Sequence, residues 1–542
     1  MSLQSRRYPK SRAVGSALVA AAVVFSGLAL RPSMPAHAAS NTLLVARDIS
    51  DGKTMDPGHS YEFTAAVVQS NTYDTLVTYN GTDTAHPVGD LATSWKVNSD
   101  GTVYTFNLRK NVRFSNGDPL TADDVVFSYL RLKYLNDNPA FLIAGATNIK
   151  ALDKYTVQIT LGAPDVSFLA ALADQNFGVL DSKLVKAHGG VDSSDAATKD
   201  KAESFLDSQS AGTGPYKMTN WTRNSQIVLE RNPNYFGPRA AFDKIIFQHQ
   251  VSAAQQRLLV QRGSVDIAMN VSLQQAQPLL HDPNVKVVTG NTLDLIYLAM
   301  TTSMTRSVPL SSKYVRQAVR YAIDYDGILK GLLKGVGTRP NSMIPVGMLG
   351  NDTATNNSLL IHQDLNKARA LMKRAGYSRG FTTSMYYTVG ATVDGVAIDP
   401  LASKIQNDLA QIGITIKLVP QQDSVNLAEY RAQKLPMILY NWGVDYADPD
   451  DYAGPFSPGG GPAKRMFYTW DSKLANIVAQ AKSSTDNAKR VALYRQVQQT
   501  WLDESPWVGL VQPQNIIVLG SNIKGYVFSP LTLGGNLRSV HK

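Results

Sequence analysis

The sequence predicts an α/β fold assembled from several parts of one long chain. Segments with the two-residue alternation of strands take turns with segments whose apolar residues recur every three or four positions, as in helices. One strand–helix–strand unit, between residues 383 and 419, has the length of a parallel crossover. No tandem repeat is visible, so the sequence gives no support to a solenoid or a propeller.

The first clear strand and helix lie between residues 101 and 131. In GTVYTFNLRK every second residue from 104 to 108 is apolar, which predicts a half-buried strand. Asn116-Gly117 then predicts a turn. Thr121, followed three residues later by Asp124, has the pattern of a helix N-cap with an acidic partner. We therefore expect a strand, a turn and a helix in this order.

The crossover unit begins with SMYYTV, which we interpret as a strand. Gly413 stands where a helix C-cap glycine belongs, and residues 414–418 alternate as a second strand. The helix between the strands has one apolar face, made of Leu401, Ile405, Leu409 and Ile412.

Other segments are less specific. Amphipathic helices are predicted over 315–322 and 365–372, the second ending near Gly376. The polar stretch from Gly189 to Ala211 is the best candidate for a surface connection. Residues 513–530 become β-like again, and the sequence does not say which part of the fold they join.

The N-terminus has the order of a secretory signal peptide. Basic residues at 6–12 precede an apolar run from Ala17 to Leu30, and Ala36-His37-Ala38 forms a small-x-small cleavage site. The apolar run is shorter than the roughly 20 residues that span a bilayer as a helix. We therefore expect residues 1–38 to be removed and the rest to be periplasmic or secreted.

Composition excludes several classes of protein. The formal charge of +10 falls to +5 without residues 1–38, and no dense Lys/Arg run follows, so we expect no nucleic-acid partner. The chain has no cysteine, which rules out disulfides, thiolate chemistry and a lipid anchor on cysteine. The eight histidines are scattered, and no phosphate-loop, hydrolase-elbow or dinucleotide fingerprint is complete. We predict no catalytic residues, no metal and no cofactor.

The segment NWGVDYADPDDYAGPFSPGGG, from residue 441 on, concentrates acidic and aromatic residues. Its acids have the chemistry of calcium ligands but not the spacing of an EF-hand. Alternatively, an aromatic ring and an aspartate line a pocket for a ligand ammonium group. A third interpretation is a solvated turn with helix-capping acids at 448, 450 and 451.

The sequence resembles the family 5 extracellular solute-binding proteins of ABC importers, the oligopeptide, dipeptide and nickel group. The resemblance runs through nearly the whole chain after residue 38. It is carried, in the order of the family, by Met55-Asp56-Pro57, NTYDTLVTYNG, LATSWKVNSDGTVYTFNLRKNVRFSNGDPLTADDVVFSYLR, GTGPYKMTNWTRNSQIVLERNPNYFG, QRGSVDIA, SSKYVRQAVRYAIDYDGIL and the segment around Asp445.

This resemblance implies a two-lobed periplasmic-binding-protein fold of the class II type, with an extra small inserted domain. The signal peptide would cover 1–38. Lobe I would be discontinuous, over 39–80, 208–291 and 505–542, and the inserted domain would cover 81–207. Lobe II would cover 292–504, and the two crossings between the lobes, near 291 and 505, would act as a hinge that closes on the ligand.

The resemblance also implies ligand-binding residues. In peptide-binding relatives an Asp three residues after a Trp pairs with the α-ammonium of the ligand, and here these residues are Asp445 and Trp442. Tyr61 and Phe63 match positions that touch the peptide backbone, and Phe141 is aligned loosely with the same cleft. Leu439 stands where some oligopeptide binders have an arginine for the ligand carboxylate, so that anchor cannot be carried over.

The implied function is capture of short peptides and their delivery to membrane permease subunits by a monomeric receptor. A binder of oligosaccharides or nickel chelates is the alternative within the family. A secreted hydrolase is the alternative of another class, and it lacks a recognisable nucleophile or metal constellation.

Overall fold

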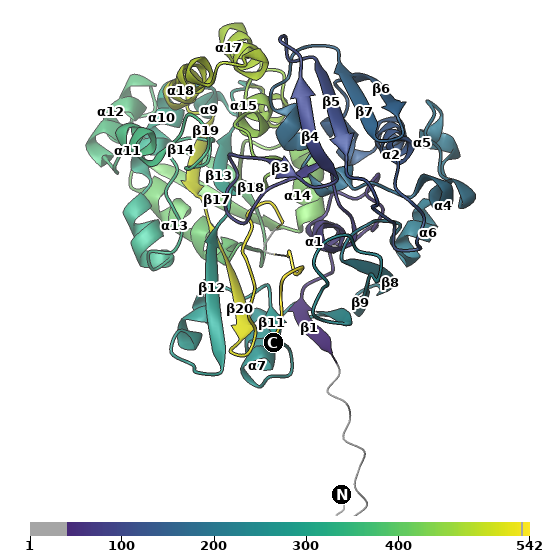
Figure 1. Cartoon of the computed structure of the whole chain (residues 1–542). Helices are drawn as coiled ribbons and strands as arrows, with labels where there is room; N and C mark the ends of the chain where they lie inside the picture. The colour runs from purple at the N-terminus through teal and green to yellow at the C-terminus, as the bar shows by residue number, and fades with distance from the viewer. Residues whose placement is uncertain (1–40, 533–534) are drawn as a thin grey trace, which may run out of the picture. The chain divides into compact units, whose positions relative to one another are not determined.

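The computed structural model describes residues 41–532 and 535–542. The predicted signal peptide, residues 1–38, lies outside the described residues. Within these residues the strands form three larger sheets and two short hairpins, with helices in the connections (Figure 1). The hairpins are β2 (Val77–Thr78) with β3 (Val88–Gly89), and β15 (Thr392–Val393) with β16 (Val396–Ala397). The mixed content confirms the predicted α/β class.

A seven-stranded mixed sheet has the order β12-β20-β11-β1-β10-β9-β8. Strand β1 runs parallel to β10 and β11, and the remaining pairs are antiparallel. Apolar residues on both faces of the sheet are buried. Its strands are β1 (Thr42–Arg47), β8 (Tyr216–Thr222), β9 (Gln226–Arg231), β10 (Lys244–His249), β11 (Ile267–Ala268), β12 (Val285–Asn291) and β20 (Gln514–Gly520).

A five-stranded sheet has the order β17-β14-β18-β13-β19. Strands β14 and β17 are parallel and joined by helix α13 (Ile398–Ala410), so the predicted crossover unit is confirmed. The predicted helix face, 401 to 412, is buried against this sheet, and Gly413 adopts a positive φ of 83° after the helix. The strands are β13 (Leu295–Met300), β14 (Phe381–Thr388), β17 (Ile414–Gln421), β18 (Met437–Trp442) and β19 (Trp507–Val511).

A four-stranded antiparallel sheet, in the order β4-β5-β7-β6, packs against helix α2 (Ala122–Leu135). The strands are β4 (Ala92–Val97), β5 (Val103–Leu108), β6 (Ala146–Asp153) and β7 (Thr156–Leu161). The predicted N-cap is confirmed as a capping box, in which Thr121 and Asp124 satisfy each other's backbone N–H groups. Gly117 makes the predicted turn with a φ of 98°.

The other helices fill the connections between these sheets. The predicted helices over 315–322 and 365–372 are confirmed as α10 (Lys313–Ala322) and α12 (Leu365–Arg374). The remaining ones are α1 (Phe63–Thr72), α3 (Phe168–Ala171), α4 (Ser182–Ala187), α5 (Ala196–Lys199), α6 (Glu203–Ser208), α7 (Ala253–Gln261), α8 (Leu273–Ala276), α9 (Val308–Ser311), α11 (Thr353–Leu359), α14 (Asp423–Arg431), α15 (Asp450–Phe456), α16 (Gly461–Arg465), α17 (Ser472–Ser483) and α18 (Asn487–Glu504), with short turns η1 (Asn138–Leu142), η2 (Gln175–Phe177), η3 (Gln277–Leu279) and η4 (Gly327–Leu332).

Two chain segments pass between the seven-stranded and the five-stranded sheet. Strand β12 continues into β13, and β19 continues into β20, so the four strands form one antiparallel ribbon that enters both sheets. The Thr292 hydroxyl donates to the Pro513 carbonyl at 2.9 Å, and the Gln512 amide donates to the Thr292 carbonyl at 2.9 Å. Because β19 pairs with β13, the boundary expected at 505 falls before a strand of the five-stranded sheet. We propose that the second crossing lies at 512–513.

The segment 189–211 is more than a surface connection. It contains α5 and α6, and three of its apolar residues are buried with Tyr73 and Phe127: Ala202, Leu206 and Ala211. It also supplies Asp200, whose carboxylate binds a buried arginine. The polar composition of this segment indicated that it is exposed. Its three buried apolar residues and the ion pair of Asp200 instead fix it to the core.

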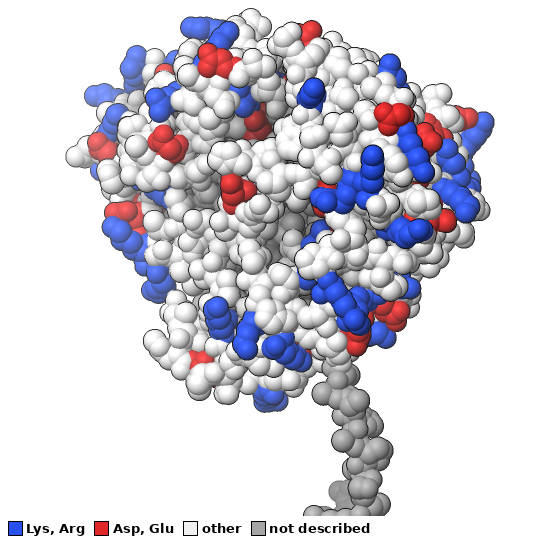
Figure 2. Space-filling view, in the orientation of Figure 1, with Lys and Arg blue, Asp and Glu red and all other residues white. Residues whose placement is uncertain are grey.

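Charges are mixed on the face of the molecule shown in Figure 2. Basic and acidic side chains are interspersed there, and the hollowed central area is mostly uncharged.

Candidate ligand-binding site

Three distant segments of the chain, together with Leu531, surround a cavity of about 170 Å³. The segments are the loop and helix from 60 to 69, the turn η2, and the end of β18 with the loop after it. The lining residues are Ser60, Tyr61, Glu62, Phe63, Ala66, Gln69, Asp174, Gln175, Asn176, Asn441, Trp442, Gly443, Val444, Asp445 and Leu531. The structure thus brings four of the five residues predicted to bind ligand to one cavity: Tyr61, Phe63, Trp442 and Asp445.

Asp445 lies where the β18 segment meets the loop that carries Tyr61. The Tyr61 hydroxyl donates to Asp445 Oδ1 at 2.5 Å, and the Asp445 N–H donates to Asp451 Oδ2 at 3.0 Å. Burial raises the pKa of Asp445 to about 6. Among the described residues no cation pairs with this carboxylate, and its side-chain hydrogen-bond partners are the Tyr61 phenol and the Asp451 carboxyl group.

The end of strand β18 has an unpaired edge beside the cavity. In the described part of the chain, β14 and β18 pair only at Tyr386 and Ile438, whereas β18 pairs with β13 along its whole length. Asn441 and Trp442, which follow this single pairing, line the cavity. An unpaired strand edge offers backbone N–H and C=O groups to an added strand.

Trp442 and Phe63 form apolar walls. The Trp442 ring meets Phe456 edge-on at 5.2 Å, and its indole N–H has no hydrogen-bond partner among the described residues. Phe63 is 47% exposed, and its ring approaches Gly443 so closely that a Cβ at this glycine would lie 3.3 Å from it. Glycine at 443 therefore allows the two sides of the cavity to come together.

Phe141 does not line this cavity. It lies in η1, meets the Tyr61 ring edge-on at 5.9 Å, and lines a neighbouring cavity of about 510 Å³ together with Tyr446 and Lys482. The structure therefore places Phe141 behind Tyr61, where it supports the ring of that residue. The loose alignment of NPAFLIAG did not distinguish these two positions.

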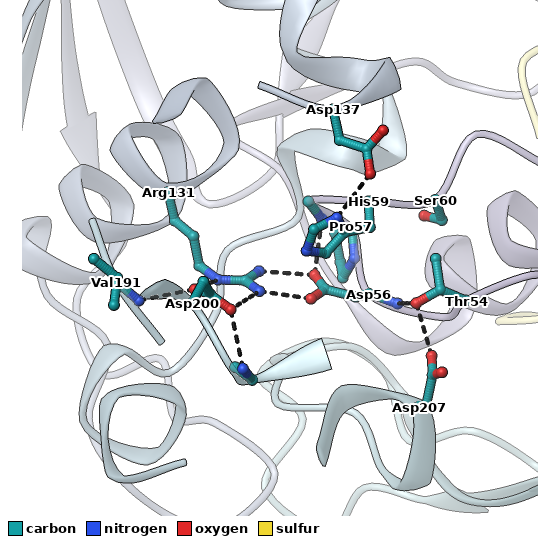
Figure 3. A network of polar contacts seen from close by, with 12 residues as sticks. Thr54, Asp56, Pro57, His59, Ser60, Arg131, Asp137, Val191, Asp200 and Asp207 are labelled. Carbon is teal, nitrogen blue, oxygen red and sulfur yellow. Dashed lines mark hydrogen bonds and ion pairs between the residues drawn. The ribbon is translucent and has the colours of Figure 1, made fainter. Parts of the chain in front are cut away.

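A buried polar network fixes the loop that carries Tyr61 (Figure 3). Arg131 on α2 donates two hydrogen bonds to Asp56, at 2.6 and 2.7 Å, and two to Asp200, at 2.8 and 2.9 Å. At the surface beside this network, His59 lies 2.8 Å from Asp137 Oδ2. The network joins the segment before Tyr61 to α2 and to the connection 189–211.

The turn η2 contributes residues that the sequence interpretation missed. The Asn176 side chain donates to the carbonyls of Pro57 and Ser60, at 2.7 and 2.9 Å, so it orders the same loop. Asp174 is 9% exposed and accepts hydrogen bonds from the Asn176 N–H and the Gln175 amide. Burial raises the pKa of Asp174 to about 8, although the Asn176 hydrogen bond lowers it. No local pattern links residue 174 to residue 445.

The three acids after Asp445 are buried, so the solvated-turn interpretation is wrong. Asp448 pairs with Arg490 at 2.7 Å, and Asp450 pairs with Lys482 at 2.8 Å. Asp451 accepts the Asp445 N–H, and burial, followed by the charge of Asp445, raises its pKa. Within the described ranges no group of three or more His, Cys, Asp or Glu residues is arranged to hold a metal ion.

Comparisons with known proteins agree with this architecture. Residues 86–464 match the bacterial extracellular solute-binding proteins, family 5 (Middle). The chain is 30% identical to the probable D,D-dipeptide-binding periplasmic protein of Escherichia coli K12, over 93% of this chain and 95% of that protein. It is 27% identical to the dipeptide-binding protein of the same organism, over 85% of this chain and 87% of that protein.

Among solved structures, the chain is similar to a periplasmic binding protein from Helicobacter pylori in complex with the peptide STSA. The identity is 27%, the TM-score is 0.77, and the alignment covers 92% of this chain and 98% of that one. This similarity supports the two-lobed periplasmic-binding-protein fold that the sequence predicted. In the described part of the chain no helix has the length and apolar character of a membrane span.

Proposed function

Because the chain belongs to the bacterial extracellular solute-binding proteins of family 5, we propose that it is the substrate-binding component of an ABC importer. It captures short peptides in the cavity around Asp445 and delivers them to permease subunits in the membrane. It acts as a monomer, in the periplasm or as a secreted protein, and by binding rather than by catalysis. Relatives described as dipeptide-binding, and one seen with a bound tetrapeptide, support this proposal.

The observation that carries the proposal is Asp445 beside the unpaired edge of β18. A carboxylate without a cationic partner suits a peptide ammonium, and the hydrogen bond between them is charge-assisted. The strand edge suits the N–H and C=O groups of an extended peptide. Together they recognise features that every peptide with a free N-terminus has, whatever its side chains.

Closure of the cleft follows from the contacts across the cavity. Tyr61 and Phe63 approach from the side of α1, whereas Gly443 and Asp445 approach from the side of β18. The ribbon of β12–β13 and β19–β20 is the covalent link between the two sheets. We propose that it acts as the hinge on which the cleft closes. A bound ammonium would replace the Tyr61 hydroxyl as the donor to Asp445.

The alternative ligands fit this geometry less well. A sugar offers neutral hydroxyl groups, which leave the carboxyl of Asp445 without a cation. A nickel chelate would be served by clustered metal-ligating side chains, and none occur in the described ranges. A peptide with a free ammonium group satisfies the buried carboxyl directly.

Isothermal titration calorimetry with a tetrapeptide and its N-acetylated form tests the proposal. We expect the free tetrapeptide to bind, and both N-acetylation and Asp445→Asn to weaken binding at least 30-fold, which is about 2 kcal/mol. Asp326→Asn is a control, because Asp326 is exposed, pairs with Lys330 and does not line the cavity. Equal affinities for the two peptides would refute the role of Asp445, and turnover of the peptide would refute binding without catalysis.

A further inference from the structure

We infer that the cavity prefers peptides with excess positive charge near the N-terminus, and that Asp174 is a second cation-binding residue beside Asp445. This inference rests on the proposed function and names the class of peptide that the same site takes. It follows from the carboxylates that line the cavity and from the lack of Lys, Arg and His among the described lining residues.

The lining residues include three carboxylates and no Lys, Arg or His. Glu62 is already neutralised, because the Lys53 ammonium lies 2.9 Å from it. Asp445 and Asp174 have no cation partner among the described residues. Asp451, whose carboxylate accepts the Asp445 N–H, also has no cation partner among the described residues, and it is 1% exposed. The cavity therefore has a second carboxyl group, that of Asp174, in addition to Asp445, which would face the ligand ammonium.

Because their pKa values are raised, Asp174 and Asp451 are largely protonated at pH 7.5 until a cation binds. Burial raises the pKa of Asp174 to about 8 and that of Asp445 to about 6, and the charge of Asp445 further raises that of Asp174. An incoming cation favours the ionised carboxylates, so its binding releases protons. The groups that face the two acids are Tyr61 before α1, Gln175 and Asn176 of η2, Asp294 before β13, and Asp451 and Tyr452 of α15.

The carboxylate of a dipeptide has no cationic partner among the described residues that line this cavity. Two extended residues span about 7 Å, so this carboxylate stays near the acids that bind the ammonium. Unlike charges at that range attract and like charges repel, and water screens them little in a closed cleft. Removing the ligand carboxylate should therefore strengthen binding. A cationic side chain on the first ligand residue should pair with the carboxylate of Asp174.

Asp174 is placed for this task by its turn. Oδ1 accepts the Asn176 N–H at 2.8 Å, and Oδ2 accepts the Gln175 amide at 2.9 Å, so its carboxyl is held at the cavity wall. Each carboxylate oxygen has a second lone pair available for a ligand donor. Asn at this position would keep the acceptor for the backbone N–H and would lose the charge.

The test uses four probes in titration calorimetry at pH 7.5: Ala-Ala, Ala-Ala-amide, Lys-Ala-amide and N-acetyl-Ala-Ala-amide. We expect Ala-Ala-amide to bind at least tenfold more tightly than Ala-Ala, and Lys-Ala-amide at least tenfold more tightly again. The acetylated probe should bind most weakly. Repeating the Lys-Ala-amide titration in buffers of different ionisation enthalpy should show proton release.

Asp174→Asn should reduce the ratio of the affinities for Lys-Ala-amide and Ala-Ala-amide towards one, and should reduce the proton release. Asp90→Asn is the matched control: Asp90 is another acid whose pKa burial raises, to about 7, but it lies outside this cavity. The control should keep the lysine preference.

Equal affinities for Ala-Ala and its amide would overturn the inference and leave the proposed function intact. Retention of the full lysine preference in Asp174→Asn would overturn the role of that residue. If none of the peptides bound, and the tetrapeptide also failed, the proposed function itself would be wrong.

Discussion

Replacing Arg131 with Met should destabilise the protein more than almost any other single change to a polar residue. Arg131 and Asp56 have fully buried side chains, and the Asp200 side chain is 2% exposed. The substitution keeps much of the side-chain volume but removes the cation that both carboxylates share. Two buried acids are then left without their partner.

The magnitude follows from these contacts. Arg131 donates four hydrogen bonds of 2.6–2.9 Å, two to each carboxylate. Removing one member of a buried ion pair typically costs about 3–5 kcal/mol. The carboxylates keep some backbone donors, from Gly58 to Asp56 and from Val191 and Ala202 to Asp200, so the loss should stay near that range.

Urea unfolding followed by tryptophan fluorescence measures this effect. Lys199→Met serves as a control, because Lys199 pairs on the surface with Asp195, the N-cap residue of the same helix. We expect that control to leave the free energy of unfolding nearly unchanged, because an exposed ion pair contributes little. A loss below about 1 kcal/mol for Arg131→Met would refute our account of the network. Because the network orders the loop before Tyr61, the variant should also bind peptide more weakly.

Two further predictions concern the cavity and its closure. The pKa of Asp174 is about 8 in the folded chain and near 3.8 when unfolded, so its contribution to stability is present at pH 4 and is lost as the pH rises to 8. The side chain introduced by Asp174→Asn cannot ionise. Without ligand, this variant should therefore have a melting temperature several degrees above that of the parent at pH 8.5, but not at pH 4. A difference in melting temperature that does not depend on pH would contradict this. Lys482 links Asp165 to Asp450, at 3.1 and 2.8 Å, so Lys482→Met should open the cleft and speed peptide dissociation about three- to tenfold in stopped-flow measurements. The control is Lys473→Met on the same helix, and an unchanged rate in Lys482→Met would exclude a clamp at this position.

Local patterns predicted the regular elements well. The alternation at 104–108, the cap at Thr121 and the apolar face of α13 are each read from fewer than 15 consecutive residues, and all three are present in the structure. These signals depend on residues that are close in the sequence, so they can be recognised without knowledge of the tertiary structure.

Long-range pairing was harder to predict. The strand WVGLV is apolar throughout, and nothing in it distinguishes the five-stranded from the seven-stranded sheet. The acids at 448 and 450 looked like parts of a solvated turn, because their partners Arg490 and Lys482 lie on distant helices. Asp174 was missed for the same reason, since only folding brings it to the cavity of Asp445.

The position of β20 has a consequence for the order of folding. This strand lies between β12 and β11, so it joins the two parts of the seven-stranded sheet. A growing chain that ends before residue 514 can pair β1 with β10 and β11, but it cannot connect them to β12. Contacts of such high sequence separation form late and slowly. We therefore expect the nascent protein to complete this sheet only after almost the whole chain has been synthesised.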